Sequence, residues 1–147
     1  YETELRENTL RLLEYRTYEY FQRLTDQQLY SGCHIDRERY TLEVQPIGSP
    51  RPLPAWRAGG GHESLLALAE RLALLRVMEF PHMLILDEPT DAVDSENVPQ
   101  LLDYVARTSE EIGQVLLVTH HGYGDEQGVN LITVSKSGAE SRVQQGL

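Results

Sequence analysis

The chain has 147 residues, 40% of them hydrophobic, which is enough for one globular domain with its own core. Its formal charge of −10 argues against direct binding to the phosphates of nucleic acid. No apolar run approaches the roughly 20 residues that cross a bilayer, so we expect no membrane partner. The single cysteine, Cys33, excludes an internal disulfide and suits a cytoplasmic protein, or a nuclear one if the source is eukaryotic. The start at Tyr1 indicates a fragment of something longer.

The first element is predicted to be an amphipathic helix over residues 1–24. Its apolar stripe has the heptad-like spacing 3, 4, 3, 4 and consists of Leu10, Leu13, Thr17, Tyr20 and Leu24. Because the stripe covers only about two heptads, it fits both the base of a coiled coil and a surface helix that faces the core.

The next segment is predicted to be irregular, with one strand. Ser31-Gly32 breaks the helical pattern, and Tyr40–Val44 alternates as a half-buried strand. Five prolines and glycines between residues 46 and 54 mark a loop that cannot be helical. A helix is then predicted over residues 63–79, and its Leu and Ala residues cover most of its circumference, which indicates a buried helix.

Two short apolar runs, Met83–Leu86 and Val115–Val118, predict strands buried on both faces of a parallel sheet. Between them Val98, Leu101, Leu102, Val105 and Ile112 keep helical spacing, with Asp94 or Ser95 as the N-cap. Strand, helix and strand make a right-handed crossover unit. Residues 131–134 predict one more strand, so the fold class is α/β.

Two adjacent carboxylates, Asp87 and Glu88, end the first of these strands in the segment MLILDEP. Open α/β folds bind ligands at the carboxyl edge of the sheet. One acid there can hold a magnesium ion, and the other can accept a proton from an attacking water. The alternative is that the two acids form a polar, proline-terminated turn without a chemical role.

The second strand ends in Thr119-His120-His121. A histidine at this edge can hydrogen-bond a phosphate oxygen or a polarised water, although two histidines can also simply cap a strand. Zinc has no support, because no cysteine or third histidine stands at ligand spacing. We expect Asp87, Glu88 and His120 to converge on one rim of the sheet.

Three glycines, Gly59, Gly60 and Gly61, precede the long buried helix. They expose backbone N–H groups at the positive end of the helix dipole, and no side chain prevents the close approach of a phosphate. The alternative is a flexible hinge whose helix is capped by a serine or histidine.

Together these motifs resemble the C-terminal half of an ABC-type ATPase head, closest to the Rad50 family within the structural-maintenance-of-chromosomes (SMC) group. AGGGHESLLALAERLALL is similar to the signature motif and its helix, MLILDEPTDAVD to the Walker B strand and D-loop, and VLLVTHH to the switch-histidine strand. The resemblance covers about residues 56–135. It implies a coiled-coil-base helix over residues 1–30 and the half-head over residues 31–147, with its parallel sheet.

The resemblance also implies roles. Asp87 helps to hold Mg²⁺, Glu88 orients or deprotonates the attacking water, and His120 contacts the γ-phosphate of ATP. The three glycines face ATP held by a second head, and Asp94 acts across that dimer interface. In this family ATP-driven closure is passed to an Mre11-type nuclease and, through the complex, to DNA.

Three departures from the family pattern stand out. No Walker A motif, G-x-x-x-x-G-K-[ST], occurs in the sequence, so we expect the chain to need a separate Walker A lobe and not to hydrolyse ATP alone. The signature serine is replaced by Gly59, or by Ala58 if the alignment shifts by one residue, and His62 could supply a compensating donor. His121 stands where the family often has an acid, so His120 or His121 is the switch.

Two other functions stay open. One is a degenerate, non-catalytic lobe that binds partners, which the missing serine favours and the intact Asp87-Glu88 pair opposes. The other is an ATPase subunit of an ABC transporter, which is opposed by the length of the signature helix and its Arg-Leu-Ala ending.

Overall fold

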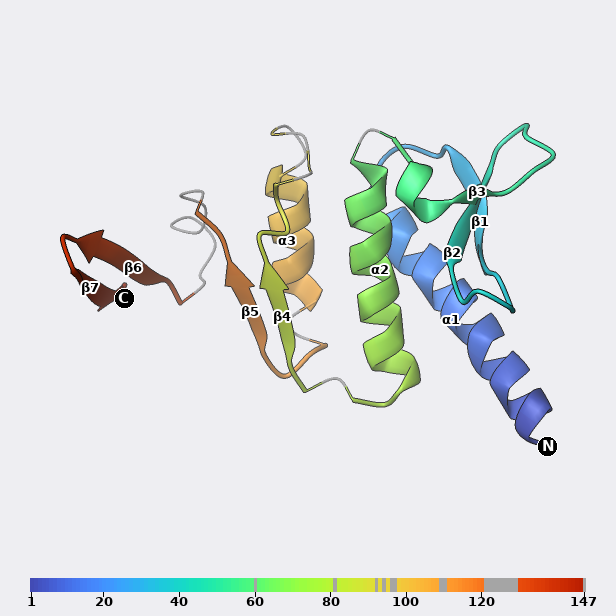
Figure 1. Cartoon of the computed structure of the whole chain (residues 1–147), viewed down its shortest axis with the longest axis horizontal. Helices are drawn as coiled ribbons and strands as arrows, with labels where there is room; N and C mark the ends of the chain where they lie inside the picture. Colours follow the sequence, from blue (N-terminus) through green and yellow to red (C-terminus); the bar gives the residue numbers. More distant parts are fainter. Residues whose placement is uncertain are drawn as a thin grey trace.

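The computed structural model describes residues 1–59, 61–80, 82–91, 93, 95, 98–108, 111–120 and 130–146. Their elements form the predicted α/β structure, which includes a two-stranded parallel sheet. The first helix and a small antiparallel sheet lie on one side of a central helix, and the parallel sheet with its own helix lies on the other (Figure 1). Within this part of the chain, no helix combines the length and the apolar character needed to cross a membrane.

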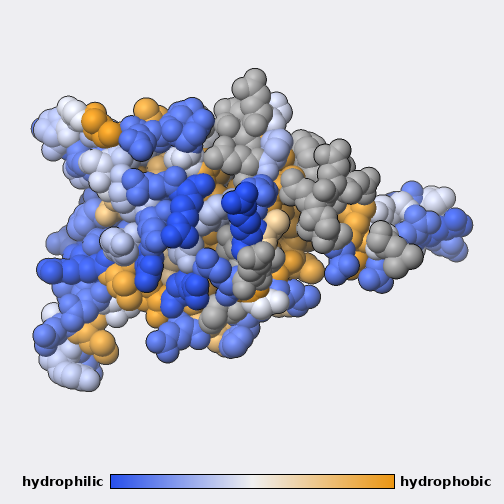
Figure 2. All heavy atoms as spheres, turned by 180° about the vertical axis from the view of Figure 1, so that it is seen from behind, coloured by the Kyte–Doolittle hydropathy of each residue, from blue (hydrophilic) through white to orange (hydrophobic). Residues whose placement is uncertain are grey.

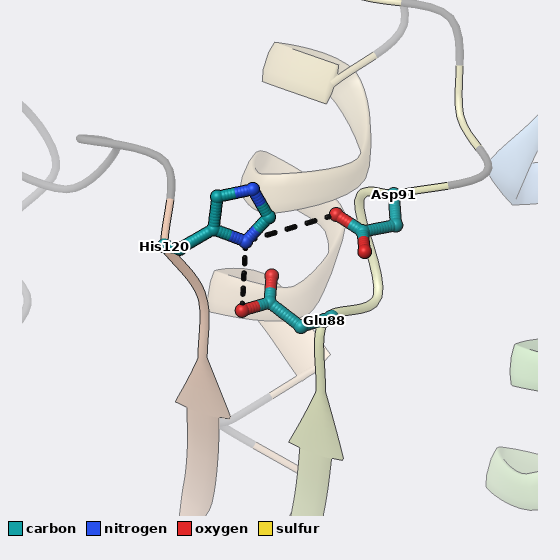
Figure 3. A group of neighbouring side chains, drawn as sticks. All are labelled: Glu88, Asp91 and His120. Atoms are coloured by element: carbon teal, nitrogen blue, oxygen red, sulfur yellow. Dashed lines mark ion pairs between the residues drawn. The ribbon is translucent and has the colours of Figure 1, made fainter.

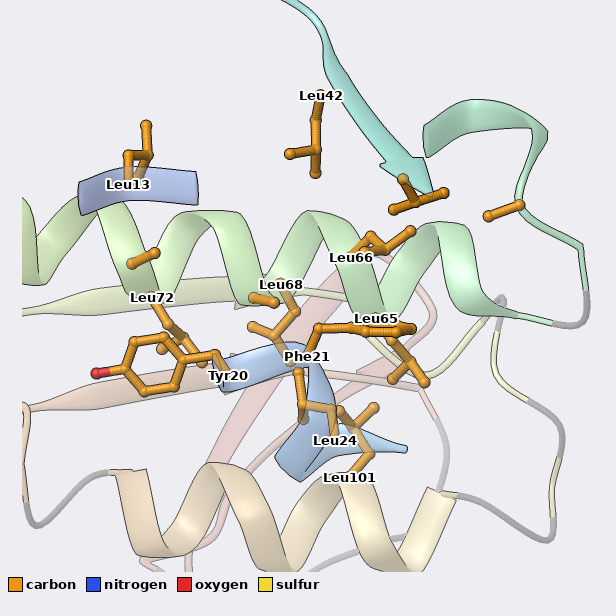
Figure 4. Close-up of a cluster of buried hydrophobic side chains, with 14 of the residues drawn as sticks. Leu13, Tyr20, Phe21, Leu24, Leu42, Leu65, Leu66, Leu68, Leu72 and Leu101 are labelled. Carbon is orange, nitrogen blue, oxygen red and sulfur yellow. The ribbon is translucent and has the colours of Figure 1, made fainter. Parts of the chain in front are cut away.

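Helix α1, Glu2–Leu24, confirms the predicted first helix and buries its apolar stripe mainly in its second half. The buried side chains are Leu13, Thr17, Tyr20, Phe21 and Leu24. All of them except Thr17 belong to the main hydrophobic core, together with side chains of the central helix α2, His62–Val77 (Figure 4). Nearer the start of α1, Leu5 is 58% exposed. The second half of α1 is therefore a core-facing helix, and the coiled-coil base with its boundary at residue 30 stays a prediction.

A small antiparallel sheet follows α1. Its strands are β1, Tyr30–Ile35, β2, Leu42–Pro46, and β3, Leu53–Pro54, and a 3-10 turn η1, Ala55–Arg57, leads on to α2. The predicted strand over residues 40–44 thus begins and ends two residues later. Tyr40 instead has a φ of 54° and closes a turn by donating its N–H to the carbonyl of Asp36 at 2.8 Å. Strands β1 and β3 were not predicted.

Arg37, in the turn between β1 and β2, fastens this sheet to α1. Its guanidinium donates to both carboxylate oxygens of Glu7, at 3.0 and 2.9 Å, and also to Glu14. These contacts, with help from Arg11, lower the pKa of Glu7 to about 2. Burial raises the pKa of Glu14, but hydrogen bonds from Arg37 and from the backbone N–H of Ile35 outweigh it, so the pKa of Glu14 is lowered as well.

Acid should loosen this attachment. A carboxylate with a depressed pKa contributes stability that is present above its unfolded pKa, 4.5 for Glu7, and that is lost as the pH falls toward the folded value of about 2. We expect the urea midpoint of Arg37→Met to be lower at neutral pH and to depend less on pH between about 5 and 2 than the wild-type midpoint. Arg39→Met, in the same turn, is the matched control. Parallel acid profiles for wild type and Arg37→Met would contradict this account.

The parallel sheet consists of β4, Leu84–Asp87, and β5, Val115–Val118, joined through α3, Val98–Thr108. The two strands and the helix confirm the predicted crossover unit, and parallel strands of one sheet take a right-handed connection. One face of this sheet joins the core. There Leu86 is 1% exposed and packs in the same cluster as Leu101 of α3.

The other face of the parallel sheet is open, which corrects the prediction that both strands are buried on two faces. Ile85 is 59% exposed, Leu116 41% and Val118 46%. Asp87 pairs with Val118 in the register and shares this face with Ile85. The strands carry apolar side chains on both faces, but the described residues cover only one of them. We call Ile85, Leu116 and Val118 the open sheet face.

The described chain ends in a β-hairpin of β6, Ile132–Ser137, and β7, Glu140–Gln145, which extends away from the rest of the structure (Figure 1). The strand predicted over residues 131–134 is longer, and β7 was not predicted. Val134 pairs with Val143, and both are 68% exposed. Hydrophobic side chains also reach the surface between the hairpin and the body (Figure 2). An isolated hairpin is marginally stable in water, and within the described residues its apolar pair is uncovered.

Candidate ATPase half-site

Glu88 and His120 meet at the carboxyl edge of the parallel sheet (Figure 3). Glu88 directly follows β4, and its backbone N–H donates to the carbonyl of Val118 at 2.8 Å, which continues the strand pairing. His120 lies two residues beyond the end of β5. Its Nδ1 is 3.0 Å from Oε1 of Glu88. The structure thus brings these two predicted site residues together on one rim.

The backbone and the surroundings of Glu88 are both unusual. Its φ of 46° is in the left-handed region, which residues with side chains rarely adopt and which is concentrated at functional sites. Its Oε2 is buried without a hydrogen-bond partner among the described residues. The hydrogen bond and charge of His120 lower the pKa of Glu88, and Glu88 in turn raises the pKa of His120. Glu88 is therefore an ionised carboxylate that His120 holds at the carboxyl edge of the sheet.

Asp91 is a third member of this cluster, which the sequence analysis had placed in the D-loop without a role. Its Oδ1 lies 4.0 Å from Nδ1 of His120 (Figure 3). A turn in which the N–H of Asp91 donates to the carbonyl of Glu88 at 3.3 Å brings it back toward the sheet edge. One ligand atom each of Glu88, Asp91 and His120 lie within 4.8 Å of one another, a spacing that could hold a cation. The sequence feature that could have indicated Asp91 is its position three residues after Glu88, in the same segment after the strand.

Asp87, the predicted magnesium ligand, lies apart from that cluster. It is exposed at the end of β4, on the same side as the open sheet face. A carboxylate oxygen is a ligand that Mg²⁺ prefers, and the ion usually keeps several waters and binds phosphate oxygens as well. The carboxylate of Asp87 is therefore accessible to a cation.

Gly59 and Gly61, in what we call the glycine turn, lead into α2. The start of α2 lies at the same end of the structure as the carboxyl ends of β4 and β5 (Figure 1). Ala58 is 5% exposed, whereas Gly59 is exposed, and a Cβ built on Gly59 meets nothing within 4 Å. Of the two positions that align with the family serine, Gly59 is therefore the one open to solvent. Gly61 is the N-cap of α2, with a φ of 76° and ψ of −6°, a conformation that glycine adopts without steric cost.

These conformations predict opposite effects for two alanine substitutions. Gly61→Ala should destabilise the protein by about 1–2 kcal/mol, since a Cβ in the left-handed conformation clashes with the following carbonyl. Gly59→Ala has free space and a φ outside that region, so it should be neutral or stabilise by about 0.4–1 kcal/mol. Urea unfolding of the two variants measures both effects. Equal stabilities would show that the backbone at Gly61 does not require glycine.

His62 lies inside the core, which corrects the prediction that it offers a donor to nucleotide. Its side chain is 4% exposed. The ring packs edge-on against Phe21 and Tyr30, with both centroid distances at 5.8 Å. Its Nδ1 lies 2.8 Å from the carbonyl oxygen of Gly59. The aromatic packing and the Gly59 contact together hold the ring inward, away from any bound phosphate.

Three residues with predicted roles lie outside the described residues: Gly60, Asp94 and His121. The structure therefore does not test the role of Asp94 across a dimer interface, or the choice between the two histidines. Helix α3 is described from Val98 onward, so capping by Asp94 or Ser95 also stays a prediction.

The comparisons with known proteins agree with the motifs. No protein-family model matches the chain. A DNA double-strand break repair Rad50 ATPase of Pyrococcus abyssi is 30% identical over 145 residues, which cover 98% of this chain and 16% of that relative. A solved structure from work on ATP-driven dimerisation and DNA-stimulated activation of SMC ATPases matches with a TM-score of 0.76 at 20% identity, covering 98% of this chain and 89% of that one. The chain is an SMC/Rad50-like C-terminal head lobe.

The SMC/Rad50-like lobe is also similar to a protein of another kind. A methionine import ATP-binding protein of Lactobacillus delbrueckii is 28% identical over 116 residues, 78% of this chain and 30% of that relative. The chain spans about one sixth of the length of its Rad50 relative. The match therefore covers a limited part of that relative, and the resemblance and α/β fold predicted from the motifs are confirmed.

Proposed function

We propose that this lobe is the signature-bearing half of a composite ATP-hydrolysing head in a DNA double-strand-break repair ATPase. The observation that carries the proposal is the Glu88–His120 pair, 3.0 Å apart at the sheet edge, with Asp87 preceding Glu88 as the last residue of β4. The Rad50 relatives are ATPases by name. Since the sequence contains no Walker A motif, the lobe works only with a second lobe that wraps the phosphates.

Each residue of the half-site has a distinct chemical task. When bound, Mg²⁺-ATP supplies the reactive phosphoanhydride and the cation that offsets its charge. Asp87 holds the cation from the side of the open sheet face. Glu88 orients the attacking water and accepts its proton at the carboxylate. His120 binds the γ-phosphate, and the pKa raised by Glu88 favours the cationic ring that attracts an anion.

The partner of the open sheet face is the Walker A lobe of the same ATPase. The exposed side chains of the open sheet face, Ile85, Leu116 and Val118, belong to strands whose other face is already in the core. A lobe that covers this face would also bring its phosphate loop beside Asp87, at the rim of the same face. The exposed Val134–Val143 pair of the hairpin fits the same covering lobe.

A second head completes the site through the glycine turn. Gly59 to Gly61 face the γ-phosphate of ATP held by that head, with Asp94 acting across the interface, so ATP joins two heads and hydrolysis releases them. One solved SMC structure is named for ATP-driven dimerisation. We propose that this motion reaches an Mre11-type nuclease, and reaches DNA through the complex rather than through this lobe, whose charge of −10 disfavours direct contact.

Head association tests this proposal. Sedimentation velocity of the complete head, with this lobe and its Walker A lobe, should show monomers without nucleotide and dimers with Mg²⁺ and a non-hydrolysable ATP analogue. The Asp87→Asn variant should need more Mg²⁺ for the same association. Heads that stay monomeric at every nucleotide concentration would rule out an ATP-sandwiched dimer.

One observation favours a second candidate, a non-catalytic lobe that binds partners. The position of the family serine is Gly59, which has no hydroxyl, so one hydrogen bond to the phosphate of the other head is missing. Such a lobe would bind nucleotide but would hydrolyse none in the complete head. Turnover of the complete head at saturating ATP separates the two functions.

The import-protein relative favours a third candidate, a transporter ATPase subunit. Its match covers 78% of this chain, against 98% for the Rad50 relative. Co-purification with a membrane-spanning partner would support this candidate, and co-purification with a nuclease and DNA would exclude it.

A further inference from the structure

The buried ring of His62 connects the glycine turn to the end of α1. On one side its Nδ1 reaches the carbonyl of Gly59, at 2.8 Å. On the other side its Nε2 lies 3.5 Å from Oγ1 of Thr25, the C-cap residue of α1. Phe21 of α1 and Tyr30 of β1 pack against the ring itself. The side chain of His62 thus joins the glycine turn to α1, whose C-cap residue Thr25 lies more than thirty residues earlier in the sequence.

The carbonyl of Gly59 is the point at which the turn is held. It accepts two hydrogen bonds from His62, one from the backbone N–H at 3.3 Å and one from Nδ1. Because a carbonyl oxygen can only accept, Nδ1 carries the proton in this arrangement. Gly59 is exposed and has no side chain that would restrict its own backbone. Of these two bonds, the one from the ring ties the turn to the core.

We propose that His62 is a positioning residue that fixes the glycine turn in the conformation that engages the nucleotide of the second head. The inference rests on the proposed function of that turn. His62 touches no nucleotide, since its ring is in the core. It acts through Gly59, because a turn that is already ordered loses less conformational entropy when the two heads associate. Its role therefore differs from the compensating phosphate donor that the sequence suggested.

Two substitutions separate the hydrogen bond from the packing of the ring. In His62→Asn the amide nitrogen takes the place of Nδ1 and can donate to Gly59, but the ring that packs against Phe21 and Tyr30 is lost. In His62→Phe the ring stays between these two neighbours, but it has no donor. A purely structural role predicts that head association follows stability in both variants. A positioning role predicts that head association is retained in His62→Asn, which keeps the donor, and is weakened in His62→Phe, which lacks it.

The experiment uses the complete head and measures the ATP-analogue concentration at half-maximal dimerisation together with the thermal unfolding midpoint. His62→Phe should raise that concentration by about 2- to 10-fold, the range for one lost hydrogen bond, and should keep the higher midpoint of the two variants. His62→Asn should associate within about twofold of wild type despite its lower midpoint. Association that declines in parallel with the midpoint in both variants would overturn the inference.

Failure of the proposed function has a different signature. If the wild-type head does not dimerise with any nucleotide, the proposed function fails, and hydrogen exchange of the residue-62 amide in the same head still tests the role of His62. That amide should exchange faster in His62→Phe than in wild type or His62→Asn, because it donates to the same Gly59 carbonyl. Equal exchange in the two variants would show that the ring does not hold the turn.

Discussion

Replacing Glu88 by glutamine in the complete head should lower ATP turnover by about 10²–10⁴-fold while ATP-driven association of the heads survives. Glutamine keeps the size of the side chain, but its amide cannot accept a proton from the attacking water. The substitution leaves His120 and the glycine turn, the proposed phosphate contacts, unchanged, so nucleotide should still join the heads. Steady-state phosphate release and sedimentation velocity on the same preparation measure the two effects.

The control for Glu88→Gln is Glu38→Gln, the same change in the exposed turn between β1 and β2. It should leave turnover within about twofold of wild type, as expected for a surface substitution away from the site. Unchanged turnover in Glu88→Gln would show that Glu88 is not the general base. Loss of association together with turnover would instead mean that Glu88 contributes to holding the nucleotide.

Gly59→Ser should strengthen ATP-dependent head association by about 10- to 100-fold, which corresponds to one hydrogen bond to a charged phosphate, about 1.5–3 kcal/mol. The substitution has room, because a Cβ on Gly59 meets nothing within 4 Å. It restores the hydroxyl that this lobe lacks at an exposed position. The measurement is the ATP-analogue concentration at half-maximal dimerisation of the complete head.

Gly59→Ala is the matched control for this gain, because it adds the Cβ but no hydroxyl. We expect it to associate like wild type, so that the difference between the two variants isolates the hydroxyl. If the serine and alanine variants behave alike, Gly59 does not face a phosphate in the dimer. If serine raises turnover as well as association, the native lobe is catalytically weak because of Gly59, and the non-catalytic alternative loses its support.

The sequence predicted the elements whose pattern is local. The helix after the glycines and the strand that ends in Asp87 and Glu88 have strong periodic or unbroken apolar runs, and both were predicted to within about two residues. Strand β1 was missed because Ser31-Gly32 and an irregular register between Tyr30 and Cys33 disrupt its alternation. Strand β7 was missed because only Val143 among its six residues is apolar.

The part of the site that lies at the ends of the parallel strands could be predicted from the sequence. Parallel strands bring their carboxyl ends together, so Glu88 and His120 could be expected to meet. The environment of His62 could not be predicted, because it depends on contacts with Phe21 and Tyr30, which are far away in sequence. The open sheet face was mispredicted for a related reason, since an apolar strand does not reveal whether its covering layer belongs to the same chain.

The most direct test of the account is ATP hydrolysis by this lobe alone, by its Walker A lobe alone and by the two lobes combined, all in the presence of Mg²⁺. We expect turnover in the combined head and none in either lobe by itself, because the proposed catalytic carboxylate and the phosphate-binding loop reside on different lobes. Turnover by this lobe alone, or its absence from a combined head that binds ATP and dimerises, would contradict the account.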